Sequence, residues 1–202
     1  MAESAVDTLE ALRSALRGRG FEPHPFQERT WRAFANGRSG LVHVPTGAGK
    51  TFAAAFGPLA ELEAQRRNRT GKREKPKIGL LWITPLRATA RDPERALQSI
   101  CSEAGFGLRI ETRSGDTEAT ARARQARRPP EVLITTPESL SLMLTRKDAA
   151  ERCSGVTGVV LDEWHELLST KRGSLTELAL ARLRRFAPAL RTWALSATLA
   201  NL

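Results

Sequence analysis

Two adjacent carboxylates, Asp162 and Glu163, directly follow the apolar run Val159-Val160-Leu161 in the stretch VTGVVLDEWHELL. A carboxylate at the end of a buried strand loses hydration free energy unless a cation or hydrogen-bond donors compensate it. A helix N-cap explains such a pair equally well, because Asp there accepts hydrogen bonds from backbone N–H groups. Taken alone, the pair leaves both a metal-binding and a capping role open.

A second stretch, VPTGAGKT at residues 44–51, follows the apolar segment 40–44 and opens a helical pattern. This strand–loop–helix context is the one that a phosphate-binding loop requires. Gly47 and Gly49 would let backbone N–H groups turn toward phosphate oxygens, and the helix N-terminus adds a favourable dipole. The strict pattern has Gly where this chain has Val44, so a glycine-rich turn that only caps a helix is the alternative.

The two stretches together favour nucleotide chemistry over separate capping roles. Ligands of an open α/β sheet bind beyond the carboxyl ends of the strands, where both stretches are expected to lie. Lys50 would reach the β- and γ-phosphates, and Thr51 and Asp162 would hold Mg²⁺ from opposite sides. Glu163 would then orient and polarise the attacking water. The compensating charge for Asp162 is thus predicted to be a metal ion with its nucleotide.

The elements that position these residues alternate between short apolar runs and helical patterns. We predict strands over 40–44, 78–84, 107–112, 131–136, 156–162 and 191–195. We predict helices over 50–66, 93–104, 117–127, 138–145 and 173–186, preceded by an amphipathic N-terminal helix and a short helix from about Gln27. Because the strands are apolar throughout, an α/β fold with a mostly parallel sheet and helices on both faces is expected. We expect the 202 residues to form one domain, 1–202.

Charge suggests a polyanionic partner. The chain has 32 basic and 22 acidic residues, a net charge of +10, and most of the surplus falls in 66–77 and 109–128. A solvated loop is an equally good interpretation of 66–77. The four Trp residues are interpreted as packing residues rather than base-stacking ones.

The cysteine and histidine residues indicate neither a redox motif nor a zinc site. Cys101 and Cys153 form no C-x-x-C motif, and we interpret both as reduced thiols of a cytoplasmic protein. The three His residues lack zinc-ligand spacing. The N-terminus is not a signal peptide, because Ser4 and Asp7 resemble a capping box, and no run is apolar enough to span a membrane.

The motifs PTGAGKT, DEWH and SATL, in this order and at these separations, resemble those of the superfamily 2 DExH helicases. The stretches WITPLRATARD (82–92), RSGDT (113–117) and ITTPESLSLML (134–144) further resemble the large helicase-related proteins, Lhr, especially the subgroup associated with DNA ligase. The resemblance runs from about Phe21 to Leu199. It implies a RecA-like P-loop NTPase domain that binds ATP and Mg²⁺.

The resemblance also implies a role for each matching position. Gln27 would read the adenine edge. Nucleotide contacts would come from Thr46, Gly47, Ala48, Gly49, Lys50 and Thr51, with Lys50, Asp162, Glu163 and His165 serving catalysis. Backbone contacts to nucleic acid would come from Thr84, Pro85, Arg87, Gly115, Asp116, Thr135, Thr136 and Ser139. His165 would link nucleotide state to the coupling motif Ser196, Ala197 and Thr198.

The implied function is an ATP-driven motor on nucleic acid, with single-stranded DNA as partner and a role in DNA repair. Family members continue into a second RecA-like domain that supplies an arginine finger, whereas this sequence ends at Leu202. We therefore expect the first motor domain alone, nearly inactive by itself. The alternatives are a translocase of another superfamily 2 type and a binding module without turnover. A P-loop kinase is disfavoured by DEWH and SATL.

Overall fold

The structure, a computed structural model, describes residues 4–69, 77–85, 90–167 and 170–197. It contains a six-stranded sheet whose order is β1-β6-β5-β2-β4-β3 and whose strand pairs are all parallel. The strands are β1 (Gly40–His43), β2 (Leu80–Ile83), β3 (Ile110–Arg113), β4 (Val132–Thr135), β5 (Gly158–Leu161) and β6 (Arg191–Ser196). The predicted parallel sheet is confirmed, with strands mostly shorter than their apolar runs.

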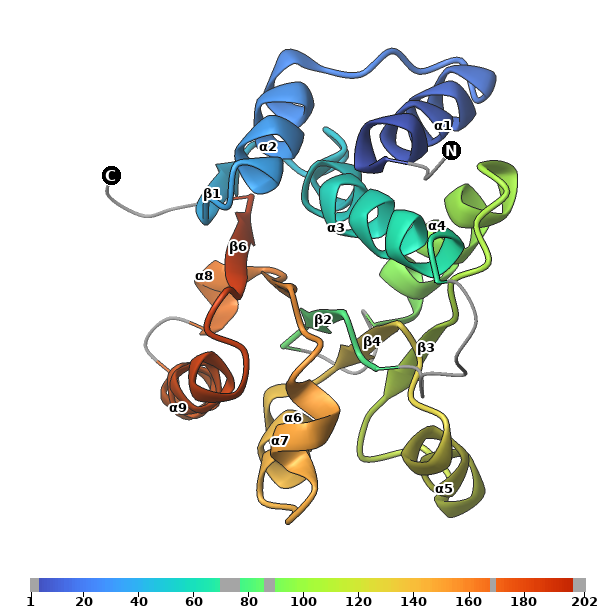
Figure 1. Ribbon diagram of the computed structural model, residues 1–202. Coiled ribbons are helices and arrows are strands. Elements are labelled where there is room, and N and C mark those ends of the chain that lie inside the picture. The colour runs from blue at the N-terminus through green and yellow to red at the C-terminus, as the bar shows by residue number, and fades with distance from the viewer. Residues whose placement is uncertain (1–3, 70–76, 86–89, 168–169, 198–202) are drawn as a thin grey trace.

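Helices connect the strands and cover both faces of the sheet (Figure 1). On one face lie α1 (Ala5–Gly18), α2 (Pro25–Ala35), α3 (Lys50–Arg67) and α4 (Arg91–Glu103). On the other face lie α6 (Pro137–Leu144), α7 (Ala149–Cys153) and α9 (Lys171–Phe186). The remaining helices are α5 (Ala119–Arg127), beside the β3 edge, and the short α8 (Trp164–Leu167), which follows β5. In the described part of the chain, no helix combines the length and apolarity needed to cross a bilayer.

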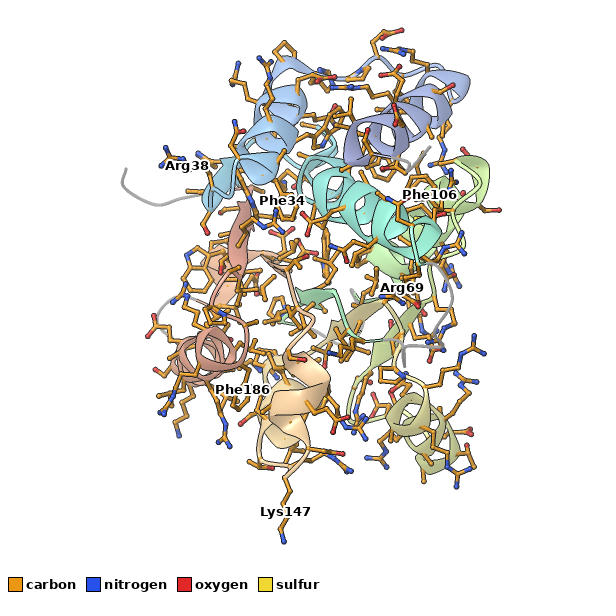
Figure 2. The ribbon with its side chains drawn as sticks, viewed as in Figure 1. Phe34, Arg38, Arg69, Phe106, Lys147 and Phe186 are labelled. Atoms are coloured by element: carbon orange, nitrogen blue, oxygen red, sulfur yellow. The ribbon has the colours of Figure 1, made fainter. Side chains whose placement is uncertain are left out.

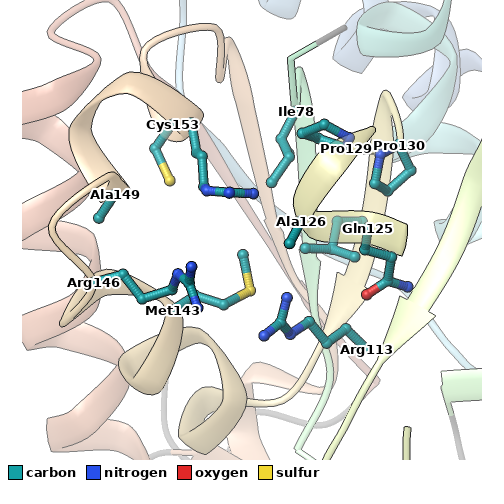
Figure 3. A pocket seen from close by; sticks show the side chains of 12 residues that line it. Ile78, Arg113, Gln125, Ala126, Pro129, Pro130, Met143, Arg146, Ala149 and Cys153 are labelled. Atoms are coloured by element: carbon teal, nitrogen blue, oxygen red, sulfur yellow. The ribbon is translucent and has the colours of Figure 1, made fainter. Parts of the chain in front are cut away.

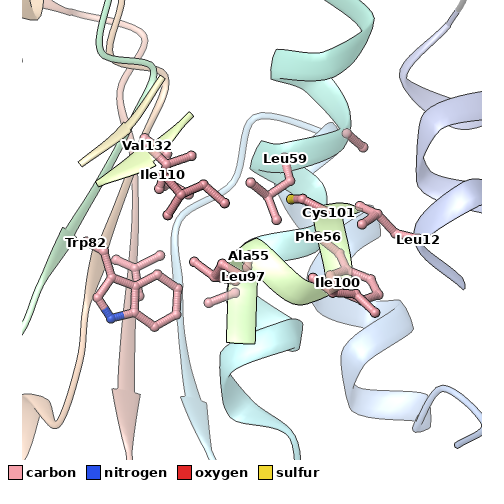
Figure 4. Packing of buried hydrophobic residues seen from close by; sticks show 14 of the residues in the cluster. Leu12, Ala55, Phe56, Leu59, Trp82, Leu97, Ile100, Cys101, Ile110 and Val132 are labelled. Atoms are coloured by element: carbon pink, nitrogen blue, oxygen red, sulfur yellow. The ribbon is translucent and has the colours of Figure 1, made fainter. Parts of the chain in front are cut away.

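Strand alternation divides the core into two layers. Leu80 and Trp82 of β2 face the α1–α4 layer, whereas Leu81 and Ile83 face the α6–α9 layer. Figure 4 shows the first layer, where Leu12, Phe56 and Ile100 meet from three helices. Because β2, β4 and β5 are buried along their whole length, each of them needs apolar residues on both faces. This requirement explains why their sequences do not alternate.

The N-terminal helix is part of the domain. Its predicted capping box is present, since Ser4 Oγ accepts from the Asp7 N–H at 3.3 Å and Asp7 Oδ2 accepts from the Ser4 N–H at 3.0 Å. The buried Thr8 hydroxyl donates to the Ala60 carbonyl of α3 at 2.8 Å. Together with the buried Leu12 and Leu16, this bond fixes α1 against the helix that begins at the glycine-rich loop.

Two short helices, α7 and α8, were not predicted from the sequence. The predicted loop over 66–77 lies largely outside the described residues, and only its two ends are seen. Basic side chains project from the surface, as Arg38 and Lys147 show in Figure 2. Cys101 and Cys153 are buried free thiols, one in each layer of the core.

Candidate nucleotide site and nucleic-acid edge

The glycine-rich loop joins β1 to the first turn of α3, as predicted. Gly47 and Gly49 adopt left-handed φ values of 83° and 86°, which L side chains rarely adopt. A Cβ added to Gly49 would also lie 2.6 Å from Gln27 Nε2. The loop therefore needs glycine at position 49 both for its backbone conformation and for the close approach of α2.

Lys50 begins α3 and is folded back across its own loop. Its Nζ donates to the Val44 carbonyl at 3.1 Å, and the residue is 8 % exposed. The first turn of α3 carries no acidic side chain, so neither Lys50 nor the helix N-terminus is neutralised there. Thr51 lies in the same turn, and Thr46 is exposed at the start of the loop. This arrangement presents a positive helix end and an ammonium group to an anion.

Gln27 lies on the face of α2 that packs against the glycine-rich loop, so its side chain is not exposed on the helix surface. It is 2 % exposed. Its Oε1 accepts from the His24 N–H at 2.8 Å, and its Nε2 donates to the Gly49 carbonyl at 3.0 Å. The amide thus keeps one donor and one acceptor position for another partner. A cavity of about 200 Å³ adjoins it, with Phe21 and Phe52 in its wall.

Asp162 follows β5 and is held by two donors. The Trp82 indole Nε1 donates to Oδ2 at 3.1 Å, and the Glu163 N–H donates to Oδ1 at 3.0 Å. Burial raises the pKa of the Asp162 carboxyl, while the Trp82 hydrogen bond and the charge of Lys50 act in the opposite direction. The charge of Lys50 therefore acts on the Asp162 carboxyl from the glycine-rich loop, which follows β1 at the same edge of the sheet.

The contact of Trp82 with Asp162 is the feature of the candidate site that sequence reasoning missed. Trp82 was predicted to be a core residue, and its ring is indeed fully buried. However, a buried indole N–H needs an acceptor, and Trp82 pairs in register with Val160, two residues before Asp162 on the neighbouring strand. Those two facts together are the signal that could have found the contact.

Glu163 and His165 form a link from β5 to β6. Glu163 has a φ of 45°, and it is the one non-glycine residue with positive φ in the described part of the chain. Such a backbone is strained and is typical of functional sites. His165 Nδ1 lies 3.4 Å from Glu163 Oε2 and 3.1 Å from Ser196 Oγ. The structure thus joins the predicted catalytic pair to the first residue of the coupling motif.

Strand order explains why these groups meet. The last strand, β6, lies between β1 and β5, and Ser196 pairs in register with His43, next to the loop. The loop, Ser196 and Asp162 therefore lie at one edge of the sheet. Ala197 follows Ser196 in the described chain, whereas Thr198 lies outside the described residues.

The residues present fit a nucleotide with magnesium. The two left-handed glycines leave room for backbone N–H groups to face an anion, and Asp162 supplies one half-buried carboxylate at the end of β5. Within the described residues, no group of three or more His, Cys, Asp or Glu side chains forms a site for a metal alone. One carboxylate together with a hydroxyl, as Asp162 and Thr51 would supply, is the donor set that Mg²⁺ uses when substrate phosphates complete its coordination.

The predicted nucleic-acid residues gather at the same edge, on its other half. Ile83 and Arg113 both pair with Thr135, so β2, β4 and β3 end side by side. The Thr84 N–H donates to the Thr135 carbonyl at 3.0 Å. The turn after β3 carries Gly115 and Asp116, which are both exposed.

Several of these side chains are buried rather than presented to solvent. This holds for Thr84, Pro85, Thr135, Thr136 and Ser139. Thr136 is also the N-cap of α6, and its hydroxyl accepts from the Ser139 N–H at 3.4 Å, so a capping role accounts for this residue without nucleic acid. The Thr135 hydroxyl is buried and has no hydrogen-bond partner in the structure. Arg87 lies outside the described residues.

A parallel sheet with a glycine-rich loop after β1, a carboxylate pair after β5 and a hydroxyl on the last residue of the intervening β6 defines a RecA-like P-loop NTPase domain. A family model described as DEAD/DEAH box helicase matches residues 24–202, so the chain belongs to the DEAD/DEAH box helicase family.

The chain is similar to Lhr helicases. It is 39% identical over 173 residues to "Lhr helicase/uracil glycosylase" of Escherichia coli, covering 80% of this chain and 11% of that protein. It is 37% identical over 171 residues to "ATP-dependent helicase Lhr-Core" of Methanothermobacter thermautotrophicus, covering 80% of this chain and 20% of that protein. The chain thus spans a fifth or less of the length of these two relatives.

Solved structures agree with this assignment. Helicase Lhr of Mycobacterium smegmatis, solved with ssDNA and AMP-PNP, has a TM-score of 0.82 and 33% identity, covering 98% of this chain and 26% of that one. The DUF1998 helicase MrfA has a TM-score of 0.78 and 25% identity, covering 95% and 29%. The predicted RecA-like fold and the resemblance to Lhr are confirmed.

Proposed function

We propose that this chain is the ATP-binding half of a nucleic-acid-dependent motor, which drives translocation on DNA and its unwinding together with a second RecA-like domain. The observation that carries the proposal is the meeting of Lys50, Asp162, Glu163 and Ser196 at one edge of the sheet, beside the ends of β2, β4 and β3. One rigid edge thereby serves both a nucleotide and a strand of nucleic acid.

In this proposal, residues 46–51 and the α3 N-terminus bind the phosphates. Lys50 would exchange its Val44 carbonyl for phosphate oxygens, and Thr51 and Asp162 would hold magnesium. A bound Mg²⁺ supplies charge neutralisation at the β- and γ-phosphates. Glu163 would orient and polarise the attacking water. The contacts of His165 with Glu163 and Ser196 would transmit nucleotide state to β6.

Gln27 is proposed to select adenine. Its remaining N–H can donate to adenine N7, while its Oε1 can accept from the adenine 6-amino group, an arrangement that guanine does not satisfy. The hydrogen bonds to His24 and Gly49 hold the amide in one orientation, which supports the proposal. Base recognition would thus be coupled directly to the phosphate-binding loop.

We propose that the ends of β2, β4 and β3, which form the other half of this sheet edge, hold the backbone of single-stranded DNA. We also propose that the protein acts in DNA repair. Phosphate contacts position a strand but carry no sequence information, so binding should be almost indifferent to sequence. The second RecA-like domain would supply the arginine finger, which contributes about 10³–10⁵ in rate where it has been measured. This chain alone should therefore bind ATP and hydrolyse it very slowly.

Nucleotide binding to the purified chain tests the proposal. A fluorescent ATP analogue is titrated with Mg²⁺ into the parent chain, Lys50→Ala and Glu163→Gln. Lys50→Ala should abolish binding, whereas Glu163→Gln should keep it, because Glu163 acts on water and not on phosphate. Undiminished binding by Lys50→Ala would disprove the site. Rapid multiple-turnover hydrolysis by the parent chain would disprove the need for a second domain.

A further inference from the structure

A second basic cavity lies away from the nucleotide site, between the β3–β4 end of the sheet and helices α5, α6 and α7 (Figure 3). It has an inner part of about 20 Å³ and an open outer part of about 360 Å³. The two parts share Ala126, Pro129 and Arg152 in their walls. None of the residues named above for nucleotide or nucleic-acid contacts lines either part, whereas Lys77, Arg113 and Arg127 belong to the basic segments 66–77 and 109–128.

Arg113 is a cation in this cavity with no counter-ion. Its side chain leaves the end of β3 and points toward Met143 and Arg146 (Figure 3). Within the described residues it makes no hydrogen bond or ion pair. Burial lowers the pKa of its guanidinium, and the charges of Arg146, Arg122 and Arg152 lower it further. A half-buried cation among cations destabilises the fold unless an anion compensates it.

Gln125 provides a second, independent sign of a missing partner. It is 4 % exposed and is the one buried residue of α5. Its Nε2 donates to Glu111 Oε2 and to the Thr112 carbonyl, both at 3.1 Å, but its buried Oε1 has no hydrogen-bond partner. The inner part of the cavity is large enough for one water molecule. Arg113 and Gln125 both line this inner part.

The outer part has unmatched positive charge. Lys77 and Arg127 line it, and neither makes an ion pair within the described residues. Its Asp148 is already matched, because Arg146 and Arg152 donate to it at 3.0 and 2.8 Å and lower its pKa to about 2.

Glu151 is the one other carboxylate in the described wall of the outer part. The walls of the two parts also contain three cations that make no ion pair within the described residues, namely Lys77, Arg113 and Arg127. The cavity as a whole therefore has a positive field and three cations that lack an anion among the described residues.

We propose that this cavity binds a phosphate group. The phosphate would lie in the outer part, with its oxygens accepting from Lys77, Arg127 and Arg152. The inner water would donate one hydrogen to the phosphate and one to Gln125 Oε1, while it accepts from Arg113. The phosphate belongs either to a nucleic-acid backbone or to a free phosphate compound. The proposal does not depend on the proposed motor function, since no residue of the nucleotide site takes part.

Pyrophosphate binding measured by isothermal titration calorimetry tests the site. The starting protein is Lys50→Ala, which removes phosphate binding at the glycine-rich loop. Adding Arg113→Gln removes the cation that the inner water links to the phosphate, and it should weaken pyrophosphate binding at least about tenfold. Adding Arg184→Gln removes the same charge from exposed α9 and should leave the affinity unchanged. Arg127→Gln, at an exposed position, gives a second test that folding defects do not confound.

The proposal is overturned if the Lys50→Ala protein does not bind pyrophosphate, or if Arg113→Gln and Arg184→Gln bind it equally well. The source of the phosphate follows from a titration with a single-stranded oligonucleotide. A loss of oligonucleotide affinity on Arg113→Gln, with competition by pyrophosphate, supports the site and assigns it to a nucleic-acid backbone. If Arg113→Gln loses pyrophosphate affinity but keeps its oligonucleotide affinity, the result supports the site and assigns it to a free phosphate compound.

Discussion

At the scale of single residues, the carboxylate of Asp162 depends on a neighbour that its own motif does not contain. Burial disfavours its charged form, and the Trp82 indole is one of the two donors that stabilise it. The second donor is the N–H of Glu163, whose backbone is strained. The orientation of this carboxylate is therefore set by a core residue on a different strand.

Replacing Trp82 with Phe should weaken Mg²⁺-dependent nucleotide binding by about tenfold. The change keeps most of the ring but removes a hydrogen bond to a charged acceptor, which contributes about 1.5–3 kcal/mol. The Mg²⁺ dependence of nucleotide affinity is the measurement. Trp193→Phe is the matched control, because the buried Trp193 indole N–H has no hydrogen-bond partner among the described residues. Equal effects of the two variants would show that the Trp82 contact is only packing.

Gln27→Ala should narrow the preference of the chain for ATP over GTP. A hydrogen-bonded base contact of this kind is expected to contribute about 1–3 kcal/mol. Because the variant also loses the bond to Gly49, both affinities should fall, and their ratio is the informative quantity. Competition of ATP and GTP against a fluorescent nucleotide measures that ratio. Equal affinities for the two nucleotides in the parent chain would exclude adenine selection by Gln27.

At the scale of elements, the sequence predicted every strand of the sheet, because buried parallel strands are apolar on both faces. The same reasoning placed the glycine-rich loop and Asp162 at the strand ends. It could not predict α7 and α8, which at 5 and 4 residues are too short to show helical periodicity. Nor could it predict that Thr135 and Ser139 are buried, since β-propensity and capping residues do not report which side chains are covered.

Leu12→Ala should destabilise the domain by about 2–5 kcal/mol, the usual cost of removing a fully buried Leu side chain. Leu12 is 0 % exposed and lies in the core layer that α1 shares with α3. Val6→Ala on the same helix is the control, because Val6 is 70 % exposed and should change stability by less than about 0.5 kcal/mol. Urea unfolding measures both. An unchanged midpoint for Leu12→Ala would mean that α1 does not belong to the cooperative unit.

At the scale of the whole molecule, one thiol lies in each core layer, so the layers can be observed separately. Burial raises the pKa of Cys101 to about 12 and that of Cys153 to about 11. In the unfolded chain both thiols ionise near pH 8.5. Because the unfolded state then loses protons that the native state keeps, stability should fall as the pH rises from about 8.5 toward these values.

Both thiols should be unreactive toward an alkylating reagent at pH 8 in the native chain, because only the thiolate reacts and both are buried. If the sheet joins its two layers into one cooperative unit, Cys101 and Cys153 should become reactive at the same urea concentration, together with the loss of far-ultraviolet circular dichroism. Mass spectrometry of the modified peptides measures each thiol separately. A nucleotide that binds only the folded chain should shift both transitions equally. If Cys153 reacted at lower urea than Cys101, the α6–α9 layer would open independently of the layer that holds the glycine-rich loop.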